Sequence, residues 1–265
     1  MPYPVRAFVA VVLSLVIALP AVGHASLPQG ARGAPRLVRR TEHFMVTLAR
    51  GSLHRKEALE FIARLEPTLA VVAERFGTPF NGRERVDILP PQRGACAIRG
   101  LTFSGKRQIQ LFYGPNTDLD RLQALMAHEL VHQLQRERFG DRVQQSADVI
   151  LLEGWAMVAS DDFARTPDGG EPRWQARMRE QVRQNAILPL TVDLGRNCRT
   201  TTRNTIYDHW ASFVAFLEQQ YGQEALATVY ASGHGRAAGS ADYAQVYGKS
   251  FADLEAEWRV WVQGQ

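Results

Sequence analysis

The spacing of apolar residues divides the chain into a mixed first half and a helical second half. Short apolar runs with strand composition occur at three places, residues 44–48, 86–89 and 108–113. Between the first two runs, apolar residues recur every three or four positions over 54–76, which predicts an amphipathic helix. Gly77 is placed to end that helix, and Pro67 is expected to kink or split it. Residues 94–105 show neither pattern and are predicted to be irregular.

From residue 118 onward the spacing is helical. The expected helices cover residues 118–139, 148–160, 172–186, 205–221, 223–230 and 250–263. Gly140 is in the position to end the first of them. Thr205, with Asp208 three residues later, predicts the start of the fourth. Strands in the first half and helices in the second indicate an α+β fold, with a small mixed sheet followed by a helical C-terminal half.

The first 25 residues differ from the rest of the chain. Arg6 is their only charge, an apolar run reaches Leu19, and small residues lead to Ala25. This pattern predicts a signal peptide, residues 1–25, because the run is shorter than the roughly 20 residues that cross a bilayer. We therefore expect an exported protein, periplasmic or secreted, with no stable membrane span after cleavage. Residues 26–37 are then a leader, and 38–263 form one domain.

Composition narrows the choice of partners and of compartment. The net charge of +4 is small for a chain of 265 residues, and no nucleic-acid motif is present, so we expect no nucleic-acid partner. Cys96 and Cys198 are the only cysteines. In an oxidising compartment such a pair favours a disulfide bond, and two buried free thiols are the alternative.

The residues that indicate chemistry are His128-Glu129-Leu130-Val131-His132. On a helix, residues four apart lie on one side, so both imidazoles can bind a single zinc ion. Glu129 lies next to them, where a carboxylate can act as general base on a metal-bound water. The alternative is an exposed helix face with two incidental histidines. It is disfavoured because the motif borders an apolar stripe formed by Leu122, Met126 and Leu130.

Two histidines leave a catalytic zinc ion short of one protein ligand. Glu153 follows the apolar run 149–152 and precedes Gly154. A carboxylate in such a stretch is costly unless it is paired or bound to metal. A helix antiparallel to the first would bring Glu153 to the histidines, and a buried salt bridge to an arginine is the alternative. We expect one zinc ion per chain.

His128-Glu129-x-x-His132, followed by Glu153-Gly154-Trp155-Ala156, resembles the gluzincin metallopeptidases, in particular exported peptidase MA-like domains, over roughly residues 38–263. The resemblance implies a zincin-like fold, in which a small mixed sheet packs on an active-site helix. It also implies zinc held by His128, His132 and Glu153, with Glu129 as base. The strand nearest the cleft would offer backbone hydrogen bonds to an extended substrate, and Gln108–Tyr113 is the candidate.

Other features near the motif are less specific. Thermolysin-like gluzincins often carry an aspartate four residues after the ligand glutamate, where this chain has Met157, so a different residue must orient the zinc-binding histidine. Tyr207 is the candidate oxyanion donor, with core packing as the alternative. His209 is the other candidate donor, although a surface or capping role fits it better. Four arginines on one predicted helix favour a solvated face, with a rim for acidic substrate or anionic envelope material as the alternative: Arg173, Arg177, Arg179 and Arg183.

The function that these residues predict is that of an exported zinc metallopeptidase acting on peptides or proteins. Two alternatives stay open. One is a catalytically silent, metal-binding envelope protein with a binding or assembly role, which would have no need of Glu129. The other is an amidase acting on cell-wall peptides, which would use the same activated water.

Overall fold

The computed structural model describes residues 36–94, 97–192 and 200–265, and the side chains of residues 200–202 are not described. The predicted signal peptide 1–25 and almost all of the predicted leader lie outside the described residues. Cys96 and Cys198 lie outside them as well. The signal peptide and the disulfide bond therefore stay predictions.

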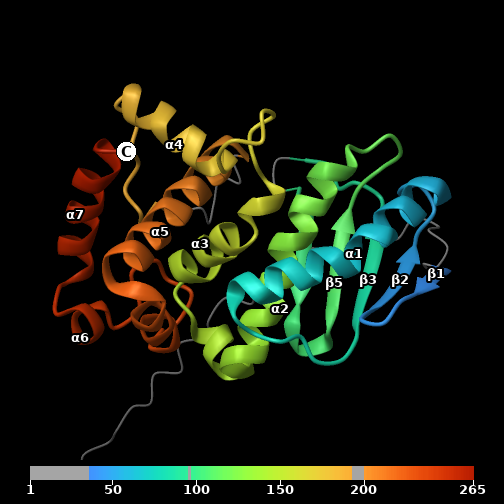
Figure 1. Ribbon diagram of the computed structural model, residues 1–265, viewed down its shortest axis with the longest axis horizontal. Coiled ribbons are helices and arrows are strands. Elements are labelled where there is room, and N and C mark those ends of the chain that lie inside the picture. Colours follow the sequence, from blue (N-terminus) through green and yellow to red (C-terminus); the bar gives the residue numbers. More distant parts are fainter. Residues whose placement is uncertain (1–35, 95–96, 193–199) are drawn as a thin grey trace, which may run out of the picture. The chain divides into compact units, whose positions relative to one another are not determined.

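The first half of the chain forms one five-stranded mixed sheet (Figure 1). Its strands are β1 (Arg36–Arg40), β2 (Phe44–Leu48), β3 (Glu84–Leu89), β4 (Gly100–Phe103) and β5 (Gln108–Phe112). The order across the sheet is β1-β2-β3-β5-β4. The three central strands run parallel, and β1 and β4 are antiparallel edge strands. The expectation of an α+β fold with a small mixed sheet is confirmed.

Two edge strands lie where the sequence predicts none. β1 begins at Arg36, inside the expected leader, and β4 lies within residues 94–105, which were expected to be irregular. Both strands are short, and their sequences show no clear alternation of apolar and polar residues. Their strand conformation comes from pairing with β2 and β5. β5 is consequently an inner strand, so the expectation that Gln108–Tyr113 is the strand nearest the cleft is wrong.

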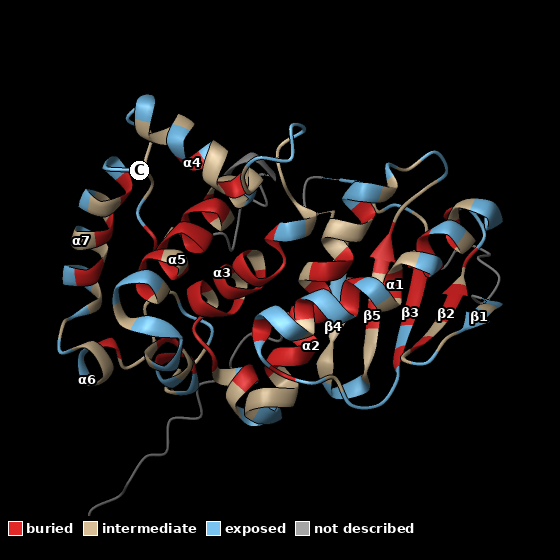
Figure 2. Cartoon of the chain, in the orientation of Figure 1, coloured by how far each residue is buried: buried red, intermediate tan, exposed pale blue. Residues whose placement is uncertain are grey.

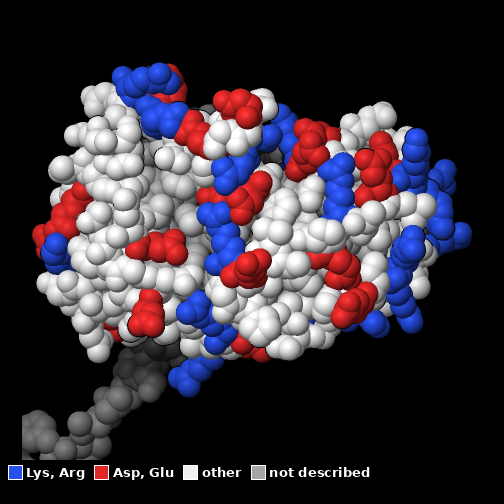
Figure 3. Space-filling model, viewed as in Figure 1, with Lys and Arg blue, Asp and Glu red and all other residues white. Residues whose placement is uncertain are grey.

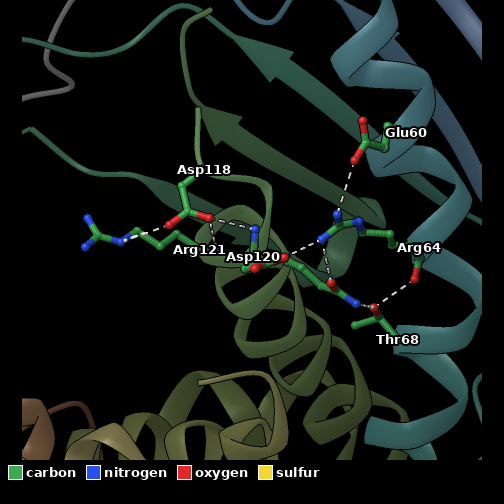
Figure 4. A network of polar contacts seen from close by, with 7 residues as sticks. Glu60, Arg64, Thr68, Asp118, Asp120 and Arg121 are labelled. Carbon is green, nitrogen blue, oxygen red and sulfur yellow. Dashed lines mark hydrogen bonds and ion pairs between the residues drawn. The ribbon is translucent and has the colours of Figure 1, made fainter. Parts of the chain in front are cut away.

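Two long helices, α1 (Arg55–Phe76) and α2 (Leu119–Ser146), pack against each other and against the sheet. Contrary to expectation, α1 continues through Pro67 without being split. Figure 4 shows the polar contacts that join the two helices. Arg64 donates to Asp120 Oδ1 over 2.6 Å, and Gln123 donates to Thr68 Oγ1 over 2.9 Å. These contacts fix the N-terminal turns of α2, the helix that carries the histidine motif.

Capping residues set the limits of α2. Asp118 is the N-cap and accepts hydrogen bonds from the backbone N–H groups of Asp120 and Arg121. Gly140 adopts φ 82° and ψ 164°, which interrupts the helix where the sequence predicts its end. A short helical segment then continues to Ser146, and it places Gln144 beside the functional site.

The described part of the second half contains helices and no named strand. They are α3 (Val149–Ala159), α4 (Arg173–Arg183), α5 (Thr200–Ala231), α6 (Tyr243–Tyr247) and α7 (Phe251–Gln263). α5 already includes Thr200, so Thr205 lies inside the helix and the predicted N-terminus there is wrong. Gly222, with φ 83°, interrupts α5 between the two expected helices. Ser250 caps α7 in a capping box with Asp253.

The core of the helical half is built around α3, which is buried along most of its length (Figure 2). Trp155 of α3 packs against the rings of Phe76, Phe139 and Tyr230, which come from α1, α2 and α5. α3 is therefore held on several sides. None of the described helices is long and apolar enough to cross a membrane.

Candidate metal centre

Three potential metal ligands meet where α2 faces α3. His128 and His132 lie one turn apart on α2, and Glu153 lies on α3. Their ligand atoms are all within 4.8 Å of one another. Glu153 Oε2 is 3.2 Å from His128 Nε2 and 3.4 Å from His132 Nε2. The structure thus brings together the three side chains that the sequence predicts as ligands.

The position of Glu153 depends on the residue that follows it. A Cβ added at Gly154 would lie 2.5 Å from the carbonyl oxygen of Trp210 and 2.7 Å from Val214 Cγ2. α3 therefore approaches α5 to a distance that only glycine permits. This close packing fixes the turn of α3 that presents Glu153 to the histidines.

The donor set fits zinc. Two imidazole nitrogens and one carboxylate oxygen leave a fourth tetrahedral position for water or substrate, as in catalytic zinc sites. Without a metal, the three groups stabilise one another electrostatically. Burial would raise the pKa of Glu153, but the two imidazoles outweigh it and hold that pKa well below its usual range. Burial would lower the pKa of His132, but the Glu153 carboxylate outweighs it and raises that pKa to about 9.

Gln135 orients His132, a role that the sequence analysis missed. The side-chain amide of Gln135 donates to the carbonyl oxygen of Leu152 over 2.8 Å, so its oxygen must face the histidine. His132 Nδ1 lies 2.9 Å from that oxygen and therefore carries the ring proton, which leaves Nε2 free to bind a metal. The signal was present in the sequence, because Gln135 lies three residues after His132 on the same helix.

His128 is oriented differently. Its Nδ1 atom is buried and has no hydrogen-bond partner within the described part of the chain. Met157, four residues after Glu153, supplies no carboxylate acceptor. The two histidines thus differ: His132 is held by a hydrogen bond to Gln135, and His128 by packing and by Glu153.

Glu129 faces the edge strand β4. Its Oε2 atom accepts a 2.6 Å hydrogen bond from Thr102 Oγ1. Its Oε1 atom lies against the backbone of Gly100, where a Cβ would be only 2.3 Å away. The side chain is 6% exposed, so its position is set by β4 rather than by solvent. The strand beside the candidate base is therefore β4, and β5 lies behind it.

Tyr207 of α5 lies beside the metal ligands. The centroid of its ring is 6.4 Å from that of His128, and the residue lines the same cavity. Burial, together with the carboxylates of Glu153 and Glu129, raises the pKa of Tyr207, so the phenol keeps its proton at neutral pH.

His209 is a core residue, contrary to the expectation of a surface or capping role. It is fully buried; its Nε2 accepts from the backbone N–H of Leu188 over 3.0 Å, and its Nδ1 lies 2.7 Å from the carbonyl oxygen of Thr205. Both ring nitrogens are thus engaged within the protein, so His209 is not available as an oxyanion donor. The expectation was wrong because α5 begins before Thr205, which places His209 on a buried face.

The ligands and Glu129 line a cavity of about 790 Å³, whose walls come from β4, α2, α3, α4 and α5. The arginines of α4 divide between this cavity and the outer surface. Arg173 and Arg177 line the cavity. Arg179 and Arg183 do not, and they pair with Glu171 and Glu180.

No family model matches the chain, and the comparison with curated proteins finds no relative. Among solved structures, the chain is similar to an M1 zinc metallopeptidase from Deinococcus radiodurans, with 21% sequence identity and a TM-score of 0.44. That alignment covers 88% of this chain and 51% of the other. A mutant of that metallopeptidase matches with 19% identity and a TM-score of 0.45 over the same shares. This chain therefore spans about half the length of the structures it matches.

Proposed function

We propose that the protein is a zinc-dependent metallopeptidase of the gluzincin type. The observation that carries the proposal is the convergence of His128, His132 and Glu153, with Glu129 held beside them in the same cavity. A purely structural site would not need a buried carboxylate next to the ligands, aimed by a threonine from another element. One zinc ion per chain would be held by the three ligands.

Three residues beside the ligands would take part in peptide hydrolysis: Glu129, Thr102 and Tyr207. When bound, zinc supplies a water ligand whose pKa is lowered towards neutrality, and it polarises the carbonyl oxygen of the substrate. Glu129 takes the proton of that water and passes it to the leaving amine. Because Thr102 donates to Oε2, the Oε1 atom is left to take the proton. The Tyr207 hydroxyl would donate to the oxyanion that develops on the substrate.

The edge strand β4 is the surface that would bind the peptide. Among the described strands it pairs with β5 alone, so backbone groups on its other side would be available to an extended chain. Gly100 and Thr102 of this strand also contact Glu129. A peptide paired with β4 would therefore lie next to the base, with its carbonyl near the metal ligands.

The compartment belongs to the same proposal. The signal peptide would direct export to the periplasm or the exterior and be cleaved after Ala25, and Cys96 and Cys198 would form a disulfide bond there. The intact mass of secreted protein, before and after reduction with thiol alkylation, tests both points. Two thiols that react without reduction would contradict the disulfide and leave the metal site unaffected.

The decisive experiment separates metal binding from chemistry. Glu129→Gln keeps the size of the side chain and removes its basicity. We expect it to retain zinc and to lose hydrolysis of casein by more than about 10²-fold, the lower end for removal of a general base. Glu153→Ala should lose zinc and activity together. Glu171→Ala, which removes a half-buried carboxylate outside the cavity, is the control and should change neither.

The outcomes distinguish the proposal from its alternatives. The assay is run on casein and on cell-wall fragments, with and without a chelator. Hydrolysis of cell-wall peptides alone would indicate an amidase, and bound zinc without any hydrolysis would indicate a silent binding protein. If Glu129→Gln stays as active as the wild type, the mechanism is wrong.

A further inference from the structure

The cavity is rich in arginine. Five guanidinium groups and three carboxylates line it: Arg99, Arg173, Arg177, Arg203 and Arg236, with Glu129, Glu153 and Asp208. The whole chain is nearly balanced, with 31 basic and 27 acidic residues. On the face drawn in Figure 3, blue and red groups alternate over the middle, much of the left part is uncharged, and blue groups gather at the right edge. Within the cavity, arginines outnumber carboxylates by five to three.

The carboxylates of the cavity are already engaged. Asp208 forms two hydrogen bonds with Arg177, of 2.6 Å from Nε and 2.5 Å from Nη2, so these two charges compensate each other. Glu153 faces the two histidines, and Glu129 accepts from Thr102. Among the described lining residues, no carboxylate is left to bind an ammonium group of a substrate.

The other four arginines have no carboxylate partner among the described residues. Arg173 donates from Nε to the carbonyl oxygen of Arg165 over 2.6 Å, and Arg203 donates to that of Ala97 over 3.0 Å. These bonds orient the guanidinium groups but leave their charge uncompensated. Arg99 lies over the ring of Tyr113, 5.8 Å from its centroid. Arg236 is exposed.

The four arginines come from different walls. Arg99 directly precedes Gly100 of β4, Arg173 begins α4, and Arg236 follows the end of α5. Arg203 lies one helical turn before Tyr207 on α5, so the two side chains share a face of that helix. The positive charge in the cavity thus comes from several of its walls. Guanidinium groups bind carboxylates through paired hydrogen bonds, which makes arginine well suited to this ligand.

We propose that this cavity selects peptides that carry carboxylates close to the scissile bond, either on acidic side chains or at a free C-terminus. The inference rests on the proposed peptidase function and names its substrate class. The same arrangement disfavours a free amino terminus in the cavity, because the four uncompensated cations repel an ammonium group and no carboxylate among the described lining residues is left to receive it.

The test measures binding apart from hydrolysis. Four fluorescent hexapeptides of one sequence are titrated into the zinc-loaded Glu129→Gln protein; two flanking positions carry either glutamate or glutamine, and the C-terminus is either free or amidated. We expect the peptides with carboxylates to bind at least about 10-fold more tightly at low salt. The difference should shrink at about 1 M salt, where screening reduces the Debye length to about 3 Å. A glutamate preference assigns the recognised carboxylate to side chains, and a free-terminus preference assigns it to the C-terminus.

Arginine variants locate the effect. Arg203→Gln and Arg236→Gln, each in the Glu129→Gln protein, should reduce the preference several-fold. Arg236 is exposed, so its replacement leaves the fold intact even if the Arg203 variant is unstable. Arg183→Gln is the matched control, because this exposed arginine of α4 lies outside the cavity.

Equal affinity for all four peptides, or a preference that both cavity variants leave unchanged, would overturn the inference. Wild-type protein that hydrolyses acidic and neutral peptides with equal kcat/KM would keep the proposed function and overturn the selection of carboxylates. Charge-selective binding without hydrolysis of any peptide would overturn the proposed function instead. The two failures are therefore distinguishable.

Discussion

Gly100 and Glu129 touch across the boundary between the sheet and α2: a Cβ at position 100 would lie 2.3 Å from Glu129 Oε1. The carboxylate can occupy its place only because β4 has no side chain there. Thr102, two residues further along the same strand, donates to the other oxygen. The short edge strand thus determines where the proposed base lies.

Gly100→Ala should lower kcat by on the order of 10²-fold with the zinc content unchanged. The added methyl group would displace the Glu129 carboxylate, and a shift of about 1 Å in a catalytic group can reduce the rate by that factor. Steady-state kinetics and metal analysis of the same samples test this. Gly105→Ala is the control, since its Cβ would meet only Asp141 Oδ1 at 3.8 Å. Full activity of Gly100→Ala would mean that Glu129 does not act from this position.

Gln135→Ala should weaken zinc binding by about 10- to 100-fold, the usual effect of removing a hydrogen-bond partner of a ligating histidine. Competition with a chelator measures the affinity. Gln135→Glu keeps an acceptor for His132 Nδ1 but loses the hydrogen bond to the Leu152 carbonyl oxygen, so it should restore part of the zinc affinity. Gln145→Ala, at an exposed position of α2, should leave the affinity unchanged. An unaltered affinity in Gln135→Ala would show that packing alone orients His132.

Tyr207→Phe should lower kcat while KM and zinc content change little, because the lost hydrogen bond forms mainly in the transition state. Tyr221→Phe is the control; the Tyr221 hydroxyl bonds to Glu257, on α7, and does not line the cavity. If Tyr207→Phe keeps the wild-type kcat, Tyr207 is a packing residue, and the oxyanion is stabilised by another group.

Glu84, on β3, should make stability depend on pH. Both of its carboxylate oxygens are buried without a hydrogen-bond partner among the described residues. Burial raises its pKa to about 8, with Arg107 and Arg136 opposing the rise and Glu137 adding to it. The folded state therefore holds a proton that the unfolded state releases near the ordinary glutamate pKa of 4.5. The stability contribution is complete below that value and is lost as the pH rises through about 8.

Urea unfolding at pH 5, 7 and 9 measures this loss. We expect the free energy of unfolding to fall by a few kcal/mol over that range, since each pKa unit corresponds to about 1.4 kcal/mol. Glu84→Gln, which is neutral at every pH, should remove most of the fall, and the control Glu171→Gln, at a carboxylate paired with Arg179, should not. An identical pH profile for Glu84→Gln and the wild type would show that Glu84 is ionised in the folded protein.

The metal ligands could be predicted from sequence because their signals are local. His128, Glu129 and His132 lie within one helical turn, and Glu153 is the single acid of an apolar stretch. β4 could not be predicted because a strand of four residues is too short to show an alternation of apolar and polar residues. Its strand conformation comes from pairing with β5. For the same reason the wrong strand was expected beside the cleft.

The remaining differences between prediction and structure have separate causes. The N-terminal turn of α5 is polar, so periodicity placed its start too late and His209 on the surface. Gln135 was overlooked although its spacing from His132 was readable. Arg99, Arg203 and Arg236 are far apart in sequence, and only the fold brings them to one cavity. No local pattern could have grouped them.

The two edges of the sheet differ in a way that bears on the behaviour of the protein at high concentration. β4 must leave one side of its backbone unpaired if it is to accept a guest peptide. An exposed edge of this kind invites a second copy of the same sheet to pair with it, and such pairing can continue into polymers. β1, at the opposite edge, carries three exposed arginines, Arg36, Arg39 and Arg40. Their charge opposes docking beside the arginine-rich cavity of a neighbour, so the protein can keep β4 open without polymerising edge to edge.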